Sequence, residues 1–424
     1  MTLHVRDATF WDQRSGEISR GDLIVESGPG GRIMPTAEPP APGAEILDAG
    51  GMLAIEGLTC AHHHLYSSLA RGMPAPPRAP RNFAEILELV WWRIDKRLDL
   101  DMIRASALAG GMDALRCGVT CIVDHHASPL NVTGSLGALA SGLDELGLAH
   151  ALCYELSDRD GPQSVEQGLA ETDAWIAAGN PGHVGLHASF TVGDDLLKRA
   201  VELAARHGAG LHLHVAEDAV DQERCLAEHD CRVVERLHRH GVLDQPGTLV
   251  VHGLHLDDQE RTLLAESEAW IVQNPESNQN NAVGVFRSDG LPPDRILVGT
   301  DGMHGDMLRS MRAAFFEGRS SEGLSPDTAL SRLFNNQRYL ERHLPAASRR
   351  NDLVLLDYRT PTPLSGDNIL GHAFFGLDAR HVRTVVADGR VVLRDGEFLS
   401  IDEPETLRLC REQARRLWDA LERS

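Results

Sequence analysis

Residues 210–217 read GLHLHVAE, and residues 58–64 read LTCAHHH. Histidine recurs at every second position in both runs, at His212 and His214 and at His62 and His64. Alternate residues of a strand share one face, so each pair projects to the same side. Such a pair forms half of a divalent metal site or a hydrogen-bonded pair near a domain seam. The pairs alone leave both interpretations open.

Further short apolar runs, separated by helical stretches, continue this pattern along the chain. The eight predicted strands are 52–61, 119–124, 150–155, 183–188, 210–214, 248–252, 270–274 and 295–300. Amphipathic segments such as 195–207 lie between them. The alternation predicts an α/β fold with a parallel sheet, closed into a TIM-like (β/α)8 barrel. A doubly wound open sheet is the competing architecture.

Polar residues gather where these predicted strands end. They are His62, His64, His125, His126, Glu155, His187, His214, His252, Asn274 and Asp301. The carboxyl ends of the strands form the catalytic face of a barrel, whereas an open sheet places its ligand at one switch point. Polar residues at the ends of all eight strands therefore favour the barrel.

The two ends of the chain have a different pattern. Residues 1–57 and 349–424 contain short strand-like runs with Gly- and Pro-rich turns, and the Asp388-Gly389 pair predicts a hairpin. We expect both ends to meet in one small β-sandwich beside a barrel of residues 58–348. A C-terminal helix is predicted over residues 402–423.

Composition excludes several classes of protein. The 424 residues are 42% hydrophobic, enough for a large core, and their formal charge of −21 lacks the basic footprint of a nucleic-acid-binding protein. No apolar run approaches the roughly 20 residues that span a bilayer, and the N-terminus lacks the order of a secretory signal. Seven cysteines without paired spacing suit reduced thiols. We therefore expect a cytoplasmic protein that binds neither membrane nor nucleic acid.

A carboxylate accompanies the histidine pairs in the predicted barrel. Asp301 follows the last predicted strand in a GTDG run, and Glu217 lies three residues after His214. Neutral imidazoles with one carboxylate form a ligand set suited to Zn²⁺ or Fe²⁺ that leaves a position for water.

The chain resembles the amidohydrolase superfamily, and within it the chlorohydrolase and cytosine-deaminase-like aminohydrolases. The resemblance rests on HxH at 62–64, HxHxxE at 212–217, VHGLH at 251–255, NPESNQNNAVGVF at 274–286, GTDG at 299–302 and VRTVVADGRVVLRDG at 382–396. Local runs such as AHHHLYSSLARG and GTDGMHGDM look closest to aminohydrolases of the SsnA type.

The resemblance implies roles for individual residues. It places a metal on His62, His64, His214 and Asp301. Among catalytic residues it implies Glu217 as the group that moves protons, Asp301 as a base, and His252 as a contact to the reacting water or the substrate. A surface carboxylate and a packed barrel histidine are the structural alternatives for Glu217 and His252.

Substrate contacts are expected at the mouth of the barrel. His187 lies where related enzymes place a substrate-binding histidine, with packing as the alternative. His125, His126, His304 and Asn274 are candidates by position, and Arg71 could pair a carboxylate if its loop turns inward, with a solvated loop arginine as the alternative.

One metal ion per chain is expected. Binuclear relatives bridge two metals with a modified lysine or a glutamate near the fourth strand, but Lys198 lies in the helix after that strand. The predicted cofactor is one divalent ion, with Zn²⁺ favoured and Fe²⁺ as the alternative.

The predicted function is deamination of a small nitrogen heterocycle, neutral or mono-anionic, by metal-activated water with release of ammonia. Hydrolysis of another C–N or C–Cl bond, in a cyclic amide, a guanidine or a chlorinated heterocycle, is the alternative within enzymes. A non-catalytic metal-binding relative is the alternative outside them. The resemblance also implies a homodimer.

Overall fold

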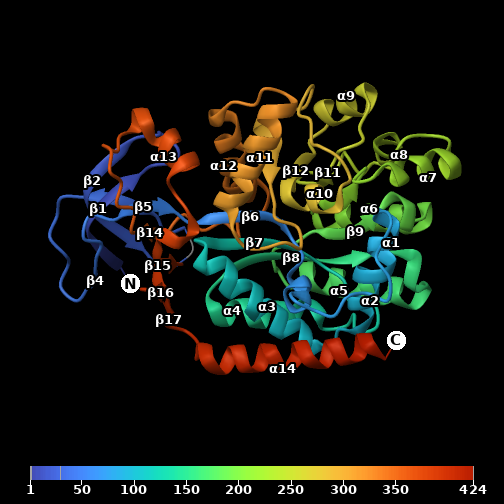
Figure 1. Cartoon of the computed structure of the whole chain (residues 1–424), viewed down its shortest axis with the longest axis horizontal. Helices are drawn as coiled ribbons and strands as arrows, with labels where there is room; N and C mark the ends of the chain where they lie inside the picture. The colour runs from blue at the N-terminus through green and yellow to red at the C-terminus, as the bar shows by residue number, and fades with distance from the viewer. Residues whose placement is uncertain (1, 29, 424) are drawn as a thin grey trace.

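The structure is a computed structural model that describes residues 2–28 and 30–423. Its centre is a parallel sheet of eight strands, each hydrogen-bonded to the strand that precedes it in the chain (Figure 1). The strands are β6 (Leu58–His63), β7 (Val119–His126), β8 (Ala149–Leu156), β9 (Val184–Ala188), β10 (Leu211–Val215), β11 (Leu249–His252), β12 (Trp270–Gln273) and β13 (Ile296–Val298). The main core lies between these strands and the surrounding helices.

The sheet closes on itself just after β13. The backbone N–H groups of Thr300 and Asp301 both donate to the carbonyl oxygen of His62, each at 3.1 Å. His64 N–H in turn donates to the carbonyl oxygen of Asp301 at 3.4 Å. The first and last strands are therefore neighbours, which confirms the predicted barrel over the open sheet.

Both ends of the chain meet in a second, mixed sheet, as predicted. Its strands are β1 (Thr2–Trp11), β2 (Ile18–Glu26), β3 (Ile33–Thr36), β4 (Glu45–Asp48), β5 (Leu53–Glu56), β14 (Leu353–Leu356), β15 (Val382–Ala387), β16 (Arg390–Arg394) and β17 (Glu397–Phe398). The antiparallel pairing of β5 with β14 joins the two ends, so the strands of the expected sandwich form one continuous hydrogen-bonded sheet. Asp388 and Gly389, at φ 51° and 69°, form the predicted hairpin turn, which needs left-handed backbone at both positions.

The predicted strand 52–61 is in fact two strands that belong to different sheets. The chain passes from β5 to β6 at Gly57, whose N–H donates to the carbonyl oxygen of Asp352 at 2.9 Å. A Cβ atom at this position would lie 2.2 Å from Thr120 Oγ1 and 2.8 Å from Asp352 Cβ. Apolar periodicity could not reveal this break because both halves are buried.

The described residues form fourteen α-helices, and most of these helices cover the outside of the barrel. They are α1 (Phe83–Ile86), α2 (Trp92–Ile94), α3 (Leu100–Arg116), α4 (Ser135–Leu146), α5 (Pro162–Ala177), α6 (Asp194–His207), α7 (Ala219–His229), α8 (Val233–Arg239), α9 (Asp258–Glu266), α10 (Pro275–Asn281), α11 (Met307–Ser321), α12 (Pro326–His343), α13 (Ile369–Phe375) and α14 (Glu403–Glu422). A π-helical turn at Leu87–Trp91 joins α1 to α2.

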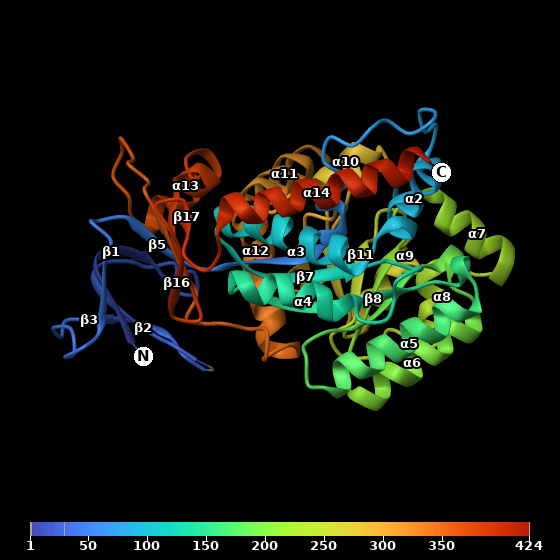
Figure 2. The same ribbon diagram turned by 90° about the horizontal axis from the view of Figure 1, so that it is seen from below.

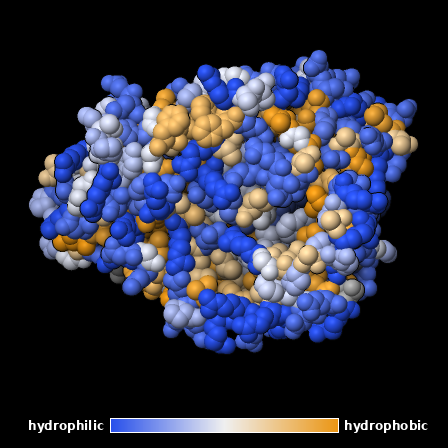
Figure 3. All heavy atoms as spheres, in the orientation of Figure 1, coloured by the Kyte–Doolittle hydropathy of each residue, from blue (hydrophilic) through white to orange (hydrophobic). Residues whose placement is uncertain are grey.

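The predicted C-terminal helix, α14, leaves the mixed sheet and lies along α3 of the barrel (Figures 1 and 2). Cys410 Sγ donates to the carbonyl oxygen of Ala105 at 3.4 Å, and Trp418 Nε1 donates to that of Leu69 at 2.8 Å. Hydrophilic side chains dominate the face seen in Figure 3, in keeping with the high charge. None of the helices among the described residues is long and apolar enough to cross a membrane.

We predict that Gly57→Ala destabilises the protein, because the new methyl group meets Thr120 and Asp352 where the two sheets join. Overpacking of this kind costs roughly 1–3 kcal/mol of unfolding free energy, measurable by urea denaturation. Gly137→Ala is the matched control, since Gly137 is an exposed residue of α4 with nothing within 4 Å of the added Cβ. Equal stability of the two variants would contradict the tight junction at Gly57.

Candidate metal centre and active-site cavity

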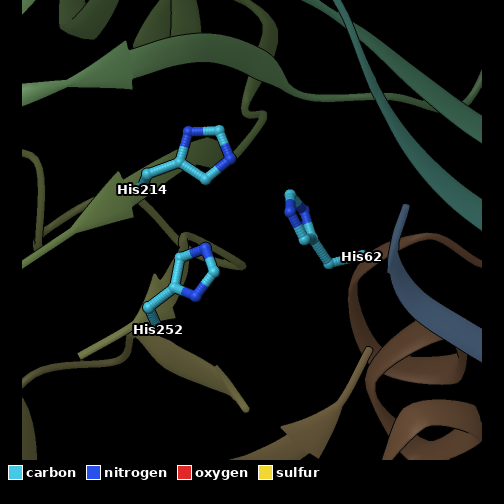
Figure 4. Close-up of side chains that lie close together, drawn as sticks. All are labelled: His62, His214 and His252. Atoms are coloured by element: carbon cyan, nitrogen blue, oxygen red, sulfur yellow. The ribbon is translucent and has the colours of Figure 1, made fainter. Parts of the chain in front are cut away.

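Four predicted ligands converge at the carboxyl end of the barrel. His62 and His64 come from the end of β6, His214 from β10, and Asp301 from the turn after β13. Asp301 Oδ1 lies 3.2 Å from His64 Nε2 and 3.6 Å from His62 Nε2. His64 Nε2 and His214 Nε2 are 3.2 Å apart. Figure 4 shows the rings of His62 and His214 pointing toward each other from different strands, with the ring of His252 beside them.

Hydrogen bonds orient each of these rings through its other nitrogen. His64 Nδ1 donates to the carbonyl oxygen of His125 at 2.6 Å, and His214 Nδ1 donates to that of His187 at 3.0 Å. A proton on Nδ1 leaves Nε2 with a free lone pair, which is the form of imidazole that binds a metal ion.

The backbone is strained beside the ligands. Asp301 has a φ of 54° and His252 a φ of 73°, both in the left-handed region that residues with a Cβ rarely adopt. Such strain is found mostly at functional sites, where the surrounding structure maintains it. It turns both side chains toward the ring cluster rather than along their strands.

Burial dominates the electrostatics of the cluster. It lowers the pKa values of His62 and His214 well below the ordinary value, which keeps both rings neutral. Burial alone would raise the pKa of Asp301, but the neighbouring His62 and His64 hold it well below its usual range. Burial also lowers the pKa of His64, yet Asp301 outweighs this effect and the pKa is about 9. A metal ion and a proton therefore compete for this nitrogen.

The cluster fits a divalent ion. His62, His64 and Asp301 can each offer one ligand atom, and these atoms lie within 4.8 Å of one another. A second group that meets the same limit consists of His62, His214 and His252. Within the described residues, the buried Nε2 of His62 has no hydrogen-bond partner. The neutral imidazoles of His62 and His214, the imidazole of His64 once an ion displaces its proton, and one ionised carboxylate match the ligand chemistry of Zn²⁺. The structure therefore brings the predicted ligands together and leaves the Nε2 atom of His62, which lies next to Asp301, available to bind an ion.

Glu217 lies close to the same cluster, beside His252 and Asp301. Its Oε2 lies 3.5 Å from His252 Nε2, and its Oε1 accepts a hydrogen bond from Asn281 Nδ2 at 3.4 Å. The other nitrogen of His252 contacts Asn278 Oδ1 at 2.8 Å. Burial raises the pKa of Glu217 to about 7, although His252 opposes the shift. A carboxyl group with this pKa can both give and take a proton near neutrality.

An open cavity borders these groups. One wall is apolar and consists of Tyr66, Phe83, Leu87, Trp91 and Trp92. All five residues of this wall come from the segment between β6 and α3, which includes the π-helical turn, a feature common at functional sites. The wall was not predicted from the sequence, where the adjacent tryptophans at 91 and 92 were a signal for it.

The cavity lining also contains acidic residues, of which Glu155 was among the predicted strand-end residues and Asp95 was missed. Asp95 and Glu155 line the cavity, and Arg159 binds Asp95 while its guanidinium lies over the Trp92 ring. Burial raises the pKa of Asp95 to about 7, against the effect of Arg159. Among the described residues that line the cavity, none is Lys or Arg.

The predicted substrate contacts divide into two groups. His187 lines the cavity as expected, with its Nδ1 2.6 Å from Thr191 Oγ1. The other five lie outside the lining: His125, His126, Asn274, His304 and Arg71.

His125 nevertheless belongs to the ring cluster, with its Nδ1 3.3 Å from Glu155 Oε2, while the surroundings of the other four differ. His125 Nε2 lies 3.1 Å from the carbonyl oxygen of His212, and His126 contacts Ser128. His304 contacts Glu276 at 2.6 Å, and Asn274 is fully buried. Arg71 is 58% exposed and pairs with Asp113, so its loop does not turn it inward.

The chain is similar over nearly its full length to named deaminases. A 5'-deoxyadenosine deaminase of Methanothermobacter thermautotrophicus is 28% identical over 95% of this chain and 96% of that protein. A 5-methylthioadenosine/S-adenosylhomocysteine deaminase of Desulforudis audaxviator is 27% identical over 99% of this chain and 100% of that protein.

Among solved structures, the fold is similar to that of an adenosine deaminase from Xanthomonas campestris with bound zinc. The TM-score is 0.81 at 20% identity, covering 98% of both chains.

The model of the Amidohydrolase family matches residues 54–392. This match confirms the resemblance inferred from the motifs. With the similarity to deaminases, it also confirms the predicted enzyme class, a hydrolase of carbon–nitrogen bonds. The chain belongs to the Amidohydrolase family.

Proposed function

We propose that the protein is a zinc-dependent deaminase that replaces an exocyclic amino group of a nitrogen heterocycle and releases ammonia. The observation that carries the proposal is the position of Glu217. Its carboxyl group lies beside His252, and the ligand atoms of Glu217, His252 and Asp301 lie within 4.8 Å of one another. Glu217 and three of the four proposed ligands, His64, His214 and Asp301, therefore line one cavity.

The proposed ligands are His62, His64, His214 and Asp301. A bound divalent ion supplies the Lewis acidity that makes water a nucleophile near neutral pH. Asp301 Oδ2 accepts a hydrogen bond from Ser277 Oγ at 2.5 Å, which holds the carboxylate where it can take a proton. Glu217 then delivers a proton to the departing nitrogen, and His252 orients the group that reacts.

The cavity walls support a flat and uncharged substrate. The aromatic wall offers ring faces on which a heterocycle can stack. The carboxylates of Asp95 and Glu155, with no Lys or Arg in the described lining, disfavour phosphate and other anionic groups. Of the neutral and mono-anionic heterocycles expected from the sequence, the cavity walls favour a neutral one, either a free base or a nucleoside. The names of the relatives, a 5'-deoxyadenosine deaminase and a 5-methylthioadenosine/S-adenosylhomocysteine deaminase, support a heterocycle of the adenosine type. The proposal includes the homodimer implied by the family resemblance.

We predict about one tightly bound divalent ion per chain. His214→Ala removes one ligand, so elemental analysis after removal of loose ions should find strongly reduced occupancy in this variant. His304→Ala is the control, because His304 contacts Glu276 and lies outside the cavity lining. Two tight ions in the unaltered protein, or full occupancy in His214→Ala, would show the site to be wrong.

Glu217→Gln should retain the metal and lose roughly 10²- to 10⁴-fold in kcat, the range for a removed general acid–base. Glu276→Gln is the matched control, since this carboxylate lies outside the cavity lining. Turnover and metal content are measured on the same preparations. If metal is lost together with activity, Glu217 is a ligand; if turnover is unchanged, it moves no proton.

The function itself is tested with a panel of aminated heterocycles offered as free bases, nucleosides and nucleotides. We expect ammonia release with a matching ultraviolet change for bases or nucleosides, and little for nucleotides. A preference for nucleotides would contradict the argument from the cavity walls. Product without ammonia, for example chloride from a chlorinated heterocycle, would favour the alternative hydrolysis.

A further inference from the structure

The Nδ1 atom of His62 is held differently from those of the other two histidine ligands. His64 and His214 donate to backbone carbonyl oxygens, whereas His62 Nδ1 lies 2.8 Å from the side-chain Nε2 of His212. His212 is fully buried, on the same face of β10 as His214 but two residues deeper in the barrel. Its position outside the cavity lining excludes contact with the substrate.

The hydrogen-bond chain continues past His212. Its Nδ1 lies 3.6 Å from Cys153 Sγ, and the Cys153 thiol donates to the carbonyl oxygen of Asp124 at 3.5 Å. A carbonyl oxygen only accepts, so the protons in this chain all point toward Asp124. His212 then carries its proton on Nδ1 and accepts from His62 Nδ1. His62 is left with a free lone pair on Nε2.

The environment of Nε2 in His62 agrees with this direction. It is buried, lacks a hydrogen-bond partner among the described residues, and lies 3.6 Å from Asp301 Oδ1. The opposite tautomer would place a proton on Nε2, where an ion needs a lone pair. A buried donor without a good acceptor would add a desolvation cost.

We infer that His212 is a positioning residue that fixes the tautomer and orientation of His62, with Cys153 fixing His212 in turn. The inference rests on the proposed metal site, and it adds that tight metal binding requires a side-chain partner for His62. The rings of His64 and His214 are held by the main chain, whereas the ring of His62 is held by a side chain, so a substitution at His212 can change how His62 is oriented without touching the cavity lining. Partners of this kind typically contribute about 10- to 100-fold to metal affinity.

The test measures Zn²⁺ affinity by competition with a chelator, and the visible spectrum of the Co²⁺-loaded protein. His212→Leu should weaken Zn²⁺ binding about 10- to 100-fold and change the Co²⁺ spectrum. His212→Gln should recover most of the affinity, because the amide oxygen can accept from His62 Nδ1. Cys153→Val, which removes only the last link, should cause a smaller loss in the same direction.

His183→Leu is the matched control. His183 is another fully buried imidazole of the barrel interior, 5.4 Å from the His212 ring, and its Nε2 contacts Tyr339 instead of a ligand. Equal affinity in His212→Leu and the unaltered protein overturns the inference, as does an equal loss in His183→Leu. If His212→Leu does not fold, unchanged affinity and spectrum in Cys153→Val overturn it. Failure of the unaltered protein to bind an ion tightly contradicts the proposed metal site itself.

Discussion

Closure of the barrel at the carbonyl oxygen of His62 is the constraint on which the site depends. This one oxygen accepts hydrogen bonds from the N–H groups of both Thr300 and Asp301. The bonds that join the last strand to the first therefore also hold the Asp301 carboxylate beside the imidazoles of His62 and His64. The left-handed backbone of Asp301 is maintained by the same bonds, so fold closure and ligand geometry cannot vary independently.

The fold was largely predictable because its signals are local. Strand periodicity and the polar ends of the strands indicated the barrel, and the alternating histidines of residues 62–64 and 212–214 indicated the ligands. Gly57 was missed because its role depends on contacts with Thr120 and Asp352, which are distant in sequence. A period of two cannot reveal where a continuous apolar run passes from one sheet into another.

The candidate site was predictable only in part, because position at a strand end does not determine where a side chain points. His125 and His126 both end β7, yet one faces the barrel interior and the other contacts Ser128. The aromatic wall lies on an irregular segment that has neither strand nor long-helix periodicity. The Asp95–Arg159 pair joins residues 64 apart, and no single-sequence pattern marks such a pair.

Acidic residues of the cavity wall bear on which ligands the cavity can accept. A metal ion neutralises part of the negative charge of Asp301, whereas Asp95 and Glu155 add carboxyl groups to the lining, and Arg159 pairs with both. An anionic substrate would meet these carboxyl groups in a site of reduced dielectric, and the formal charge of −21 would oppose its approach. A flat, neutral heterocycle avoids both costs and stacks on the tryptophans. Under the proposed function, selectivity depends on the segment before α3 together with Glu155 at the end of β8, while the chemistry depends on the ligands and Glu217 at the other strand ends.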